Sequence, residues 1–162
     1  MQTQPNPNFP SVPEMVGATN VPVFLGNSPT HLSFTTHPPT GPALLQAEPA
    51  TRRVFLNIEN VTASARAPSY QIYLNVPQGD EPHAHPELHA GDLPMFGLVE
   101  SSRAGGPHPP NGLNYTLDIT DVYTRLVAAQ RWNSKNLRVV IVPGNWNGTA
   151  KVQVGRISLY LQ

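Results

Sequence analysis

The chain has no cysteine, and this absence removes several classes of site at once. None of its 162 residues is Cys, so disulfides, thiolate metal sites and a cysteine nucleophile are excluded. The strong metal ligands that remain are histidine and carboxylate.

An excess of charge of either sign is also lacking, as are long apolar runs. Ten basic and ten acidic residues cancel, and no basic stripe is present that could neutralise a run of phosphates. No segment approaches the ~18 apolar residues of a membrane span, and the N-terminus lacks the charged and apolar regions of a signal peptide. We therefore expect a soluble chain with no nucleic-acid and no membrane partner, whose cellular location stays open.

Proline, by contrast, is abundant. The chain has nineteen prolines, where average usage gives about eight in this length. Residues 1–20 mix Pro, Asn, Gln and Thr with few large apolar groups, too few to offset the entropy of ordering. We predict a flexible arm over residues 1–20 and a single domain over residues 21–162.

Alternation with a period of two predicts half-buried strands in this domain. In RRVFLNIENVT, Val54, Leu56 and Ile58 share one face. YQIYLNVP and LNYTLDI repeat the pattern, and NLRVVIVP is apolar on both faces, as in a central covered strand. Weaker strands are expected at VPVFLG, HLSFTT and LPMFGLVE.

Two features interrupt the alternation. KVQVGRISLYL changes phase near Gly155, where we expect a β-bulge. ITDVYTRLVAAQRW has apolar residues at helical spacing, with Asp118 or Thr120 as N-cap, and predicts one helix of about three turns. About seven to nine strands with one inserted helix predict an all-β fold, an antiparallel β-sandwich or jelly-roll-like barrel.

The stretch PHAHPELHAG at residues 82–91 is the clearest candidate for a metal site. His83 and His85 would point the same way on a strand, as in a cupin-like metal enzyme. However, Glu87 follows His85 by only two residues, and the prolines at 82 and 86 disfavour a paired central strand.

A capped turn explains the same stretch more simply. Pro86 suits the start of a helical turn and Gly91 its end, with Leu88 packed inward. His83, His85 and His89 then remain as candidate ligands for adventitious metal binding. No nucleophile elbow, phosphate-binding loop, dinucleotide fingerprint or H-E-x-x-H motif is present, so no catalytic or cofactor-binding residue is assigned.

Five segments in order carry a resemblance to a known family. The chain from about residue 20 onward resembles the C-terminal domain of bacterial tyrosinases and polyphenol oxidases, which belong to the type 3 copper class. The five matching segments are Arg53–Val61, Tyr70–Pro77, His85–Glu100, Leu117–Val122 and Val152–Tyr160.

The resemblance implies a non-catalytic regulatory module. Such a domain covers the entrance of a dinuclear copper site, contributes a residue that plugs the substrate cavity, and keeps the enzyme latent. Copper would then lie in a partner catalytic domain, in cis or in trans, and no cofactor is expected in this domain. Because this domain normally follows a catalytic domain, we expect a chain that starts with Met to be an excised domain or a separately encoded relative.

Phe96 and Met95 are the candidate plug, although their place in the expected strand at LPMFGLVE favours a core position. A weaker variant of the hypothesis is copper loading through the three candidate histidines and Met95. Two alternatives stay open. One is a structural or self-assembling β-sandwich that forms homo-oligomers through an exposed edge. The other is the small cupin-like metal-binding enzyme.

Overall fold

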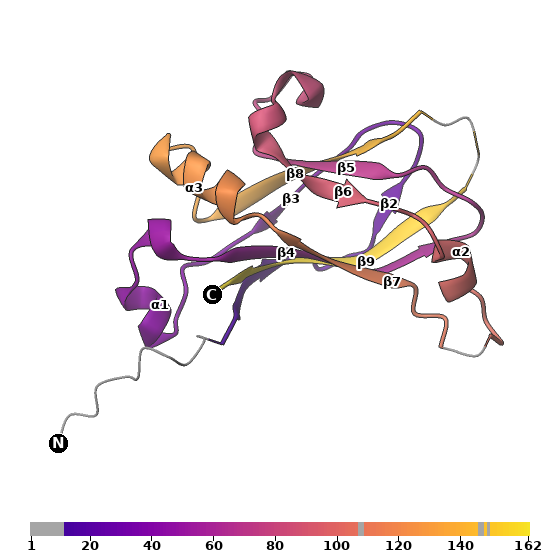
Figure 1. Cartoon of the computed structure of the whole chain (residues 1–162), viewed down its shortest axis with the longest axis horizontal. Helices are drawn as coiled ribbons and strands as arrows, with labels where there is room; N and C mark the ends of the chain where they lie inside the picture. Colours follow the sequence, from indigo (N-terminus) through magenta and orange to yellow (C-terminus); the bar gives the residue numbers. More distant parts are fainter. Residues whose placement is uncertain (1–11, 107–108, 146–147, 149) are drawn as a thin grey trace.

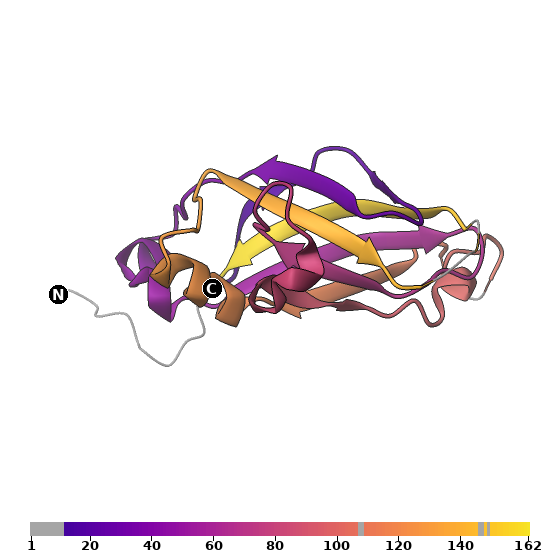
Figure 2. The same cartoon turned by 90° about the horizontal axis from the view of Figure 1, so that it is seen from above.

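Two antiparallel sheets pack around a shared apolar core. The computed structural model describes residues 12–162 apart from 107–108, 146–147 and 149. One sheet has the order β1 (Glu14–Ala18), β9 (Val152–Leu161), β4 (Val54–Ala63) and β7 (Leu113–Asp118), with β2 (Val23–Leu25) also pairing with β9. The other has the order β3 (Thr30–Thr35), β8 (Asn136–Pro143), β5 (Tyr70–Leu74) and β6 (His89–Leu93). The predicted antiparallel β-sandwich is confirmed (Figures 1 and 2).

The predicted inward faces form the core. Leu56 and Ile58 of β4 and Ile72 of β5 are completely buried. Strand β8 is covered on both sides, as its sequence predicts, because Ile141 lies in the main core while Val140 packs with Tyr73 on the opposite face.

The predicted β-bulge at Gly155 is wrong for the pairing of β4 with β9, which keeps one register through this point. Instead, both strands change the face that points inward near Gly155. Ile58 pairs with Ile157, and Val61 pairs with Val154, and all four side chains point into the core. On each strand the two inward residues are three positions apart, whereas regular alternation would separate them by two or four. Between them Asn60 adopts a left-handed conformation with φ of 52°. A Cβ on Gly155 would lie 2.9 Å from the Cβ of Asn60, so glycine permits the close approach that the change of phase requires.

The helices are short except for one. Helix α3 (Thr120–Ala128) confirms the predicted helix and buries Val122, Tyr123 and Leu126. Its N-cap is Ile119 rather than either predicted residue, although Asp118 accepts a hydrogen bond from the Thr120 N–H at 3.1 Å. Five further elements are short, and four of them begin at a proline, namely α1 (Pro42–Gln46), η1 (Pro49–Thr51), η2 (Pro82–Ala84) and η3 (Pro86–Leu88); the fifth is α2 (Leu98–Ser101).

The first strand, β1, begins before residue 21, where the domain was expected to start. Strand β1 lies within the predicted flexible arm and pairs with β9, with Val16 only 2% exposed. Its few apolar residues suffice because β9 supplies the hydrogen-bonding partner and the core surface. The rest of the predicted arm, residues 1–11, lies outside the described residues.

The sandwich has two different ends. Helix α2 lies at one end, while α1 and α3 lie at the other (Figure 1). The turns η2 and η3 rise from the sheet between β5 and β6. The candidate functional features lie at these three places, the α2 end, the end with α1 and α3, and the turns η2 and η3.

Candidate plug loop and histidine stretch

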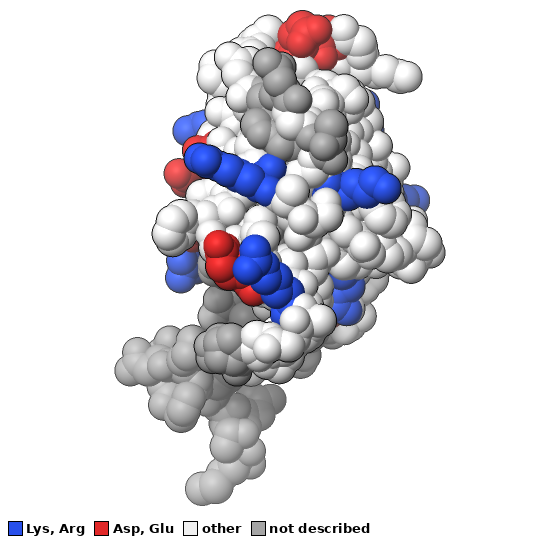
Figure 3. Space-filling model, turned by 90° about the vertical axis from the view of Figure 1, so that its right-hand side faces the viewer, with Lys and Arg blue, Asp and Glu red and all other residues white. Residues whose placement is uncertain are grey.

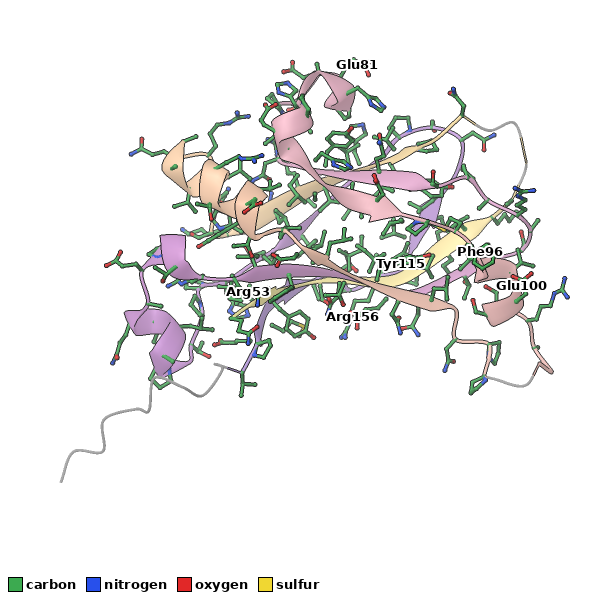
Figure 4. All side chains as sticks on the ribbon, viewed as in Figure 1. Arg53, Glu81, Phe96, Glu100, Tyr115 and Arg156 are labelled. Carbon is green, nitrogen blue, oxygen red and sulfur yellow. The ribbon has the colours of Figure 1, made fainter. Side chains whose placement is uncertain are left out.

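The connection from β6 to α2 presents one fully exposed aromatic side chain. We call residues 94–97 the plug loop. Phe96 at its tip is 96% exposed, whereas Leu93 and Leu98 on either side are buried at 0% and 1% (Figure 4). The loop is therefore fastened to the core at both ends while its phenyl ring faces outward.

Polar contacts from the neighbouring sheet hold the plug loop in place. The Tyr115 hydroxyl donates to the Pro94 carbonyl oxygen at 2.6 Å and lies 3.9 Å from the Met95 sulfur. Burial raises the pKa of Tyr115 above its ordinary value, so the phenol keeps its proton at neutral pH and can donate. At the end of the loop Gly97 has φ of 76°, a conformation that favours glycine.

A strand was predicted over LPMFGLVE, and this prediction is wrong at the two candidate plug residues, Met95 and Phe96, which lie in a loop. Strand β6 ends at Leu93, because Pro94 cannot donate to a ladder and Gly97 turns the chain into α2. Met95 packs partly against the core, and only Phe96 points away from it. A phenyl ring in this position has no acid–base chemistry, but it can fill an apolar cavity of a partner, which stabilises binding by about 1.5–3 kcal/mol.

The first part of the histidine stretch, residues 82–88, forms turns outside both sheets, and His89 is the first residue of β6. His83 lies within η2, and His85 separates η2 from η3. The predicted turn starting at Pro86 is confirmed, with Leu88 buried at 2%, but it ends at Leu88 because β6 begins at the next residue. The cupin-like hypothesis required His83 and His85 to point the same way from a strand. It is wrong, because neither residue lies on a strand.

His85 is engaged by two carboxylates. Its Nε2 lies 2.8 Å from Asp80 Oδ2, and its Nδ1 lies 3.0 Å from Glu87 Oε1. The bond to Glu87 and then that to Asp80 raise the pKa of His85, and the same contact lowers the pKa of Glu87. This arrangement is an ion-pair network at the surface.

The other two histidines flank an aromatic ring instead of joining His85. The Tyr73 ring lies 5.8 Å from that of His83 and 5.3 Å from that of His89, and His89 Nε2 is 2.9 Å from Asp92 Oδ1. Among the described residues, no group of three or more His, Asp or Glu side chains is arranged to hold a metal ion. Met95 lies in the plug loop beyond the end of β6, where its sulfur is 3.9 Å from the Tyr115 hydroxyl.

A groove beside α2 was not predicted from the sequence. It has a volume of about 710 Å³ and is lined by Phe24 of β2 and by Ser102, which follows α2. Phe24 is 67% exposed. Figure 3 shows basic side chains spread over this end of the molecule, with acidic side chains at the top and on the left of the view. Phe24 belongs to the strand expected at VPVFLG, so the sequence did indicate a strand here. Alternation alone does not tell which strand lies at the open edge of a sheet, and the groove could not be predicted from it.

No helix in the described part of the chain is long and apolar enough to cross a membrane.

Comparison with known proteins confirms the resemblance to tyrosinases. The chain is 30% identical over 156 residues to tyrosinase HcTyr1 of Hahella sp. (strain CCB-MM4), covering 93% of this chain and 33% of that protein. It therefore spans about a third of the length of this curated relative.

Solved structures show the same fold. A recombinantly expressed latent aurone synthase (polyphenol oxidase) matches with a TM-score of 0.54 at 14% identity, over 88% of this chain and 26% of that one. Latent aurone synthase from natural source matches with a TM-score of 0.51 at 17% identity, over 88% and 26% of the two chains. Residues 12–162 match one family, and the chain belongs to that family, the Domain of unknown function (DUF7868).

Proposed function

We propose that this chain is a non-catalytic module that covers the substrate entrance of a tyrosinase-like dinuclear copper domain, with Phe96 entering that entrance. The observation that carries the proposal is the 96% exposure of Phe96 on a loop held by buried residues on both sides. The tyrosinase relative and the latent state of the structural neighbours support it, because in each case the likeness covers only a minor part of a longer protein.

The rigid support of the plug loop suits an insertion role. A lone exposed apolar residue is ordinary on a protein surface. Phe96 differs because Leu93, Leu98 and the Tyr115 hydroxyl fix the loop beneath it. A side chain that is already held in its bound position loses little conformational entropy on docking.

The surface around α2 suits a docking face. The groove beside α2 adds a second exposed phenylalanine, Phe24, at the same end of the sandwich. The centres of protein interfaces are enriched in aromatic residues and depleted of charged ones. The two exposed phenylalanines, Phe24 and Phe96, fit the aromatic part of that pattern.

The described side chains of this chain do not fit a dinuclear copper site, because no three candidate ligands converge. The copper that oxidises phenols would be held by the partner domain. The role of this chain would be steric, since Phe96 would occupy the space of a substrate ring and the surrounding face would exclude solvent. The histidine arrangement lends no support to copper loading.

Mixing experiments test the proposal. The chain, added to the isolated catalytic part of the Hahella relative, is expected to lower the initial rate of diphenol oxidation in a saturable way while the copper content stays constant. The inhibition is expected to be relieved by substrate, because both compete for one entrance. An unchanged rate at saturating chain, together with a large particle in light scattering, would instead favour a self-assembling structural protein.

A further inference from the structure

A cavity of about 480 Å³ lies at the end of the sandwich that carries α1 and α3, away from the plug loop (Figure 1). Tyr123 and Val127 of α3 and Leu159 and Leu161 of β9 contribute to its lining. Its volume is within the range of about 300–1,000 Å³ that small-molecule sites occupy. A ligand at this end is independent of the proposed covering function, because Phe96 lies at the other end.

Two aromatic residues in the lining carry polar atoms that the fold leaves unpaired. Tyr123 is only 2% exposed, Trp132 is half-buried, and their rings meet edge to face with centroids 4.8 Å apart. Among the described residues, neither the Tyr123 hydroxyl nor the Trp132 Nε1–H has a hydrogen-bond partner, and neither atom is sealed from the surface. Buried tyrosine and tryptophan usually have such a partner, so the pair points to a ligand that supplies it.

The cavity does not suit a charged ligand. Arg52 belongs to the lining, but its Nη2 donates to a backbone carbonyl oxygen at 2.8 Å and its Nε is buried. Glu14 lies close enough to His37 to interact with it, and the backbone N–H of Thr40 is the main cause that lowers the pKa of Glu14. This ionised carboxylate disfavours an anion. It does not require a cation, because its two oxygens already accept bonds from Thr40 and Gly41.

We propose that this cavity binds a small uncharged aromatic compound with a carbonyl group, such as an aryl amide. The Tyr123 hydroxyl and the Trp132 Nε1–H can both donate, and a carbonyl oxygen accepts with two lone pairs and no net charge. The ring of the ligand would lie against Val127, Leu159 and Leu161, where burial of its apolar surface stabilises the complex.

Chemical-shift titration of the ¹⁵N-labelled chain with benzamide at pH 7 tests the proposal. Benzoate is the charged match, and acetamide is the match without a ring. Saturable shifts are expected at the Trp132 indole N–H and at the Val127 and Ser134 backbone amides, with a Kd on the order of 1 mM for so small a probe. Benzoate and acetamide are each expected to bind about tenfold more weakly.

Variants separate the two donors from general apolar binding. Tyr123→Phe keeps the ring and removes the hydroxyl, so it is expected to weaken benzamide binding about fivefold. The melting temperature should not fall, because the hydroxyl has no partner among the described residues. Trp132→Phe is expected to weaken binding as well, with the Val127 and Ser134 amides as the readout. Tyr160→Phe, on the outward side of β9, is the matched control and should leave binding unchanged.

Four results would overturn the proposal. The first is a set of shifts that do not saturate with benzamide, and the second is equal binding of benzoate or acetamide. The third is unchanged benzamide binding in both Tyr123→Phe and Trp132→Phe. The fourth is a clear fall in the melting temperature of Tyr123→Phe but not of Tyr160→Phe, which would show that the Tyr123 hydroxyl is already paired within the chain.

Discussion

Tyr115 of β7 and Pro94 after β6 join the two sheets at the plug loop, since the Tyr115 hydroxyl donates to the Pro94 carbonyl oxygen at 2.6 Å. Strand β7 belongs to one sheet and β6 to the other. The loop that exposes Phe96 is therefore supported from below by a side chain that belongs to the opposite layer.

Removing that hydroxyl should loosen the loop. Tyr115→Phe keeps the buried ring and leaves the Pro94 carbonyl without its donor, which is expected to cost about 0.5–1.5 kcal/mol in the free energy of unfolding. Urea unfolding measures this change. The same substitution at Tyr160, on the outward side of β9, is the control, and an equal loss there would show that the Tyr115 bond has no special role.

The left-handed backbone conformation of Gly97 leads to a second prediction, about the stability of Gly97→Ala. A Cβ at this position meets no atom within 4 Å, so Gly97→Ala acts only through the left-handed φ of 76°. It is expected to destabilise the protein by about 1–2 kcal/mol. Gly26 is equally open but has no positive φ, so Gly26→Ala should change stability by less than about 0.5 kcal/mol. Similar effects at both positions would refute the assignment of strain to Gly97.

The contacts of His85 with two carboxylates predict how the stability of the protein depends on pH. Its pKa is raised in the folded state by Glu87 and Asp80, so its stabilising contribution is fully present below the unfolded value of about 6.5. The contribution is lost as pH rises through the folded pKa. The urea midpoint of His85→Gln should therefore fall below that of the unmodified chain at pH 5.5, and the difference should shrink by pH 9. A difference that stays constant across this range would contradict the ion-pair geometry.

The strands were predictable because burial in this fold follows the alternation of side chains. Val54, Leu56 and Ile58 are all completely buried, and the change of phase near Gly155 that the sequence indicates appears in the burial pattern of β9. The histidine turn was predictable for a local reason too, since Pro86 starts it.

Features that depend on tertiary partners were not predictable in this way. Strand β1 exists because Met15 and its neighbours pair with β9, which nothing in the composition of residues 1–20 indicates. Phe96 was a candidate plug from the sequence, but a core position was favoured because a strand was expected at LPMFGLVE, although Pro94 and Gly97 were signals of a turn. The cavity beside Trp132 arises from segments far apart in the chain, and no local pattern marks it.

The central claim is tested most directly by replacing Phe96. Inhibition of the catalytic part of the Hahella relative should be measured with the unmodified chain, with Phe96→Ala, and with Leu45→Ala at an exposed apolar position on α1 at the other end. If Phe96 enters the entrance, Phe96→Ala should weaken inhibition at least about tenfold, because a buried phenyl ring contributes about 1.5–3 kcal/mol to binding. Its stability should stay within about 0.5 kcal/mol of the unmodified chain, and Leu45→Ala should inhibit normally. Undiminished inhibition by a folded Phe96→Ala would contradict the account.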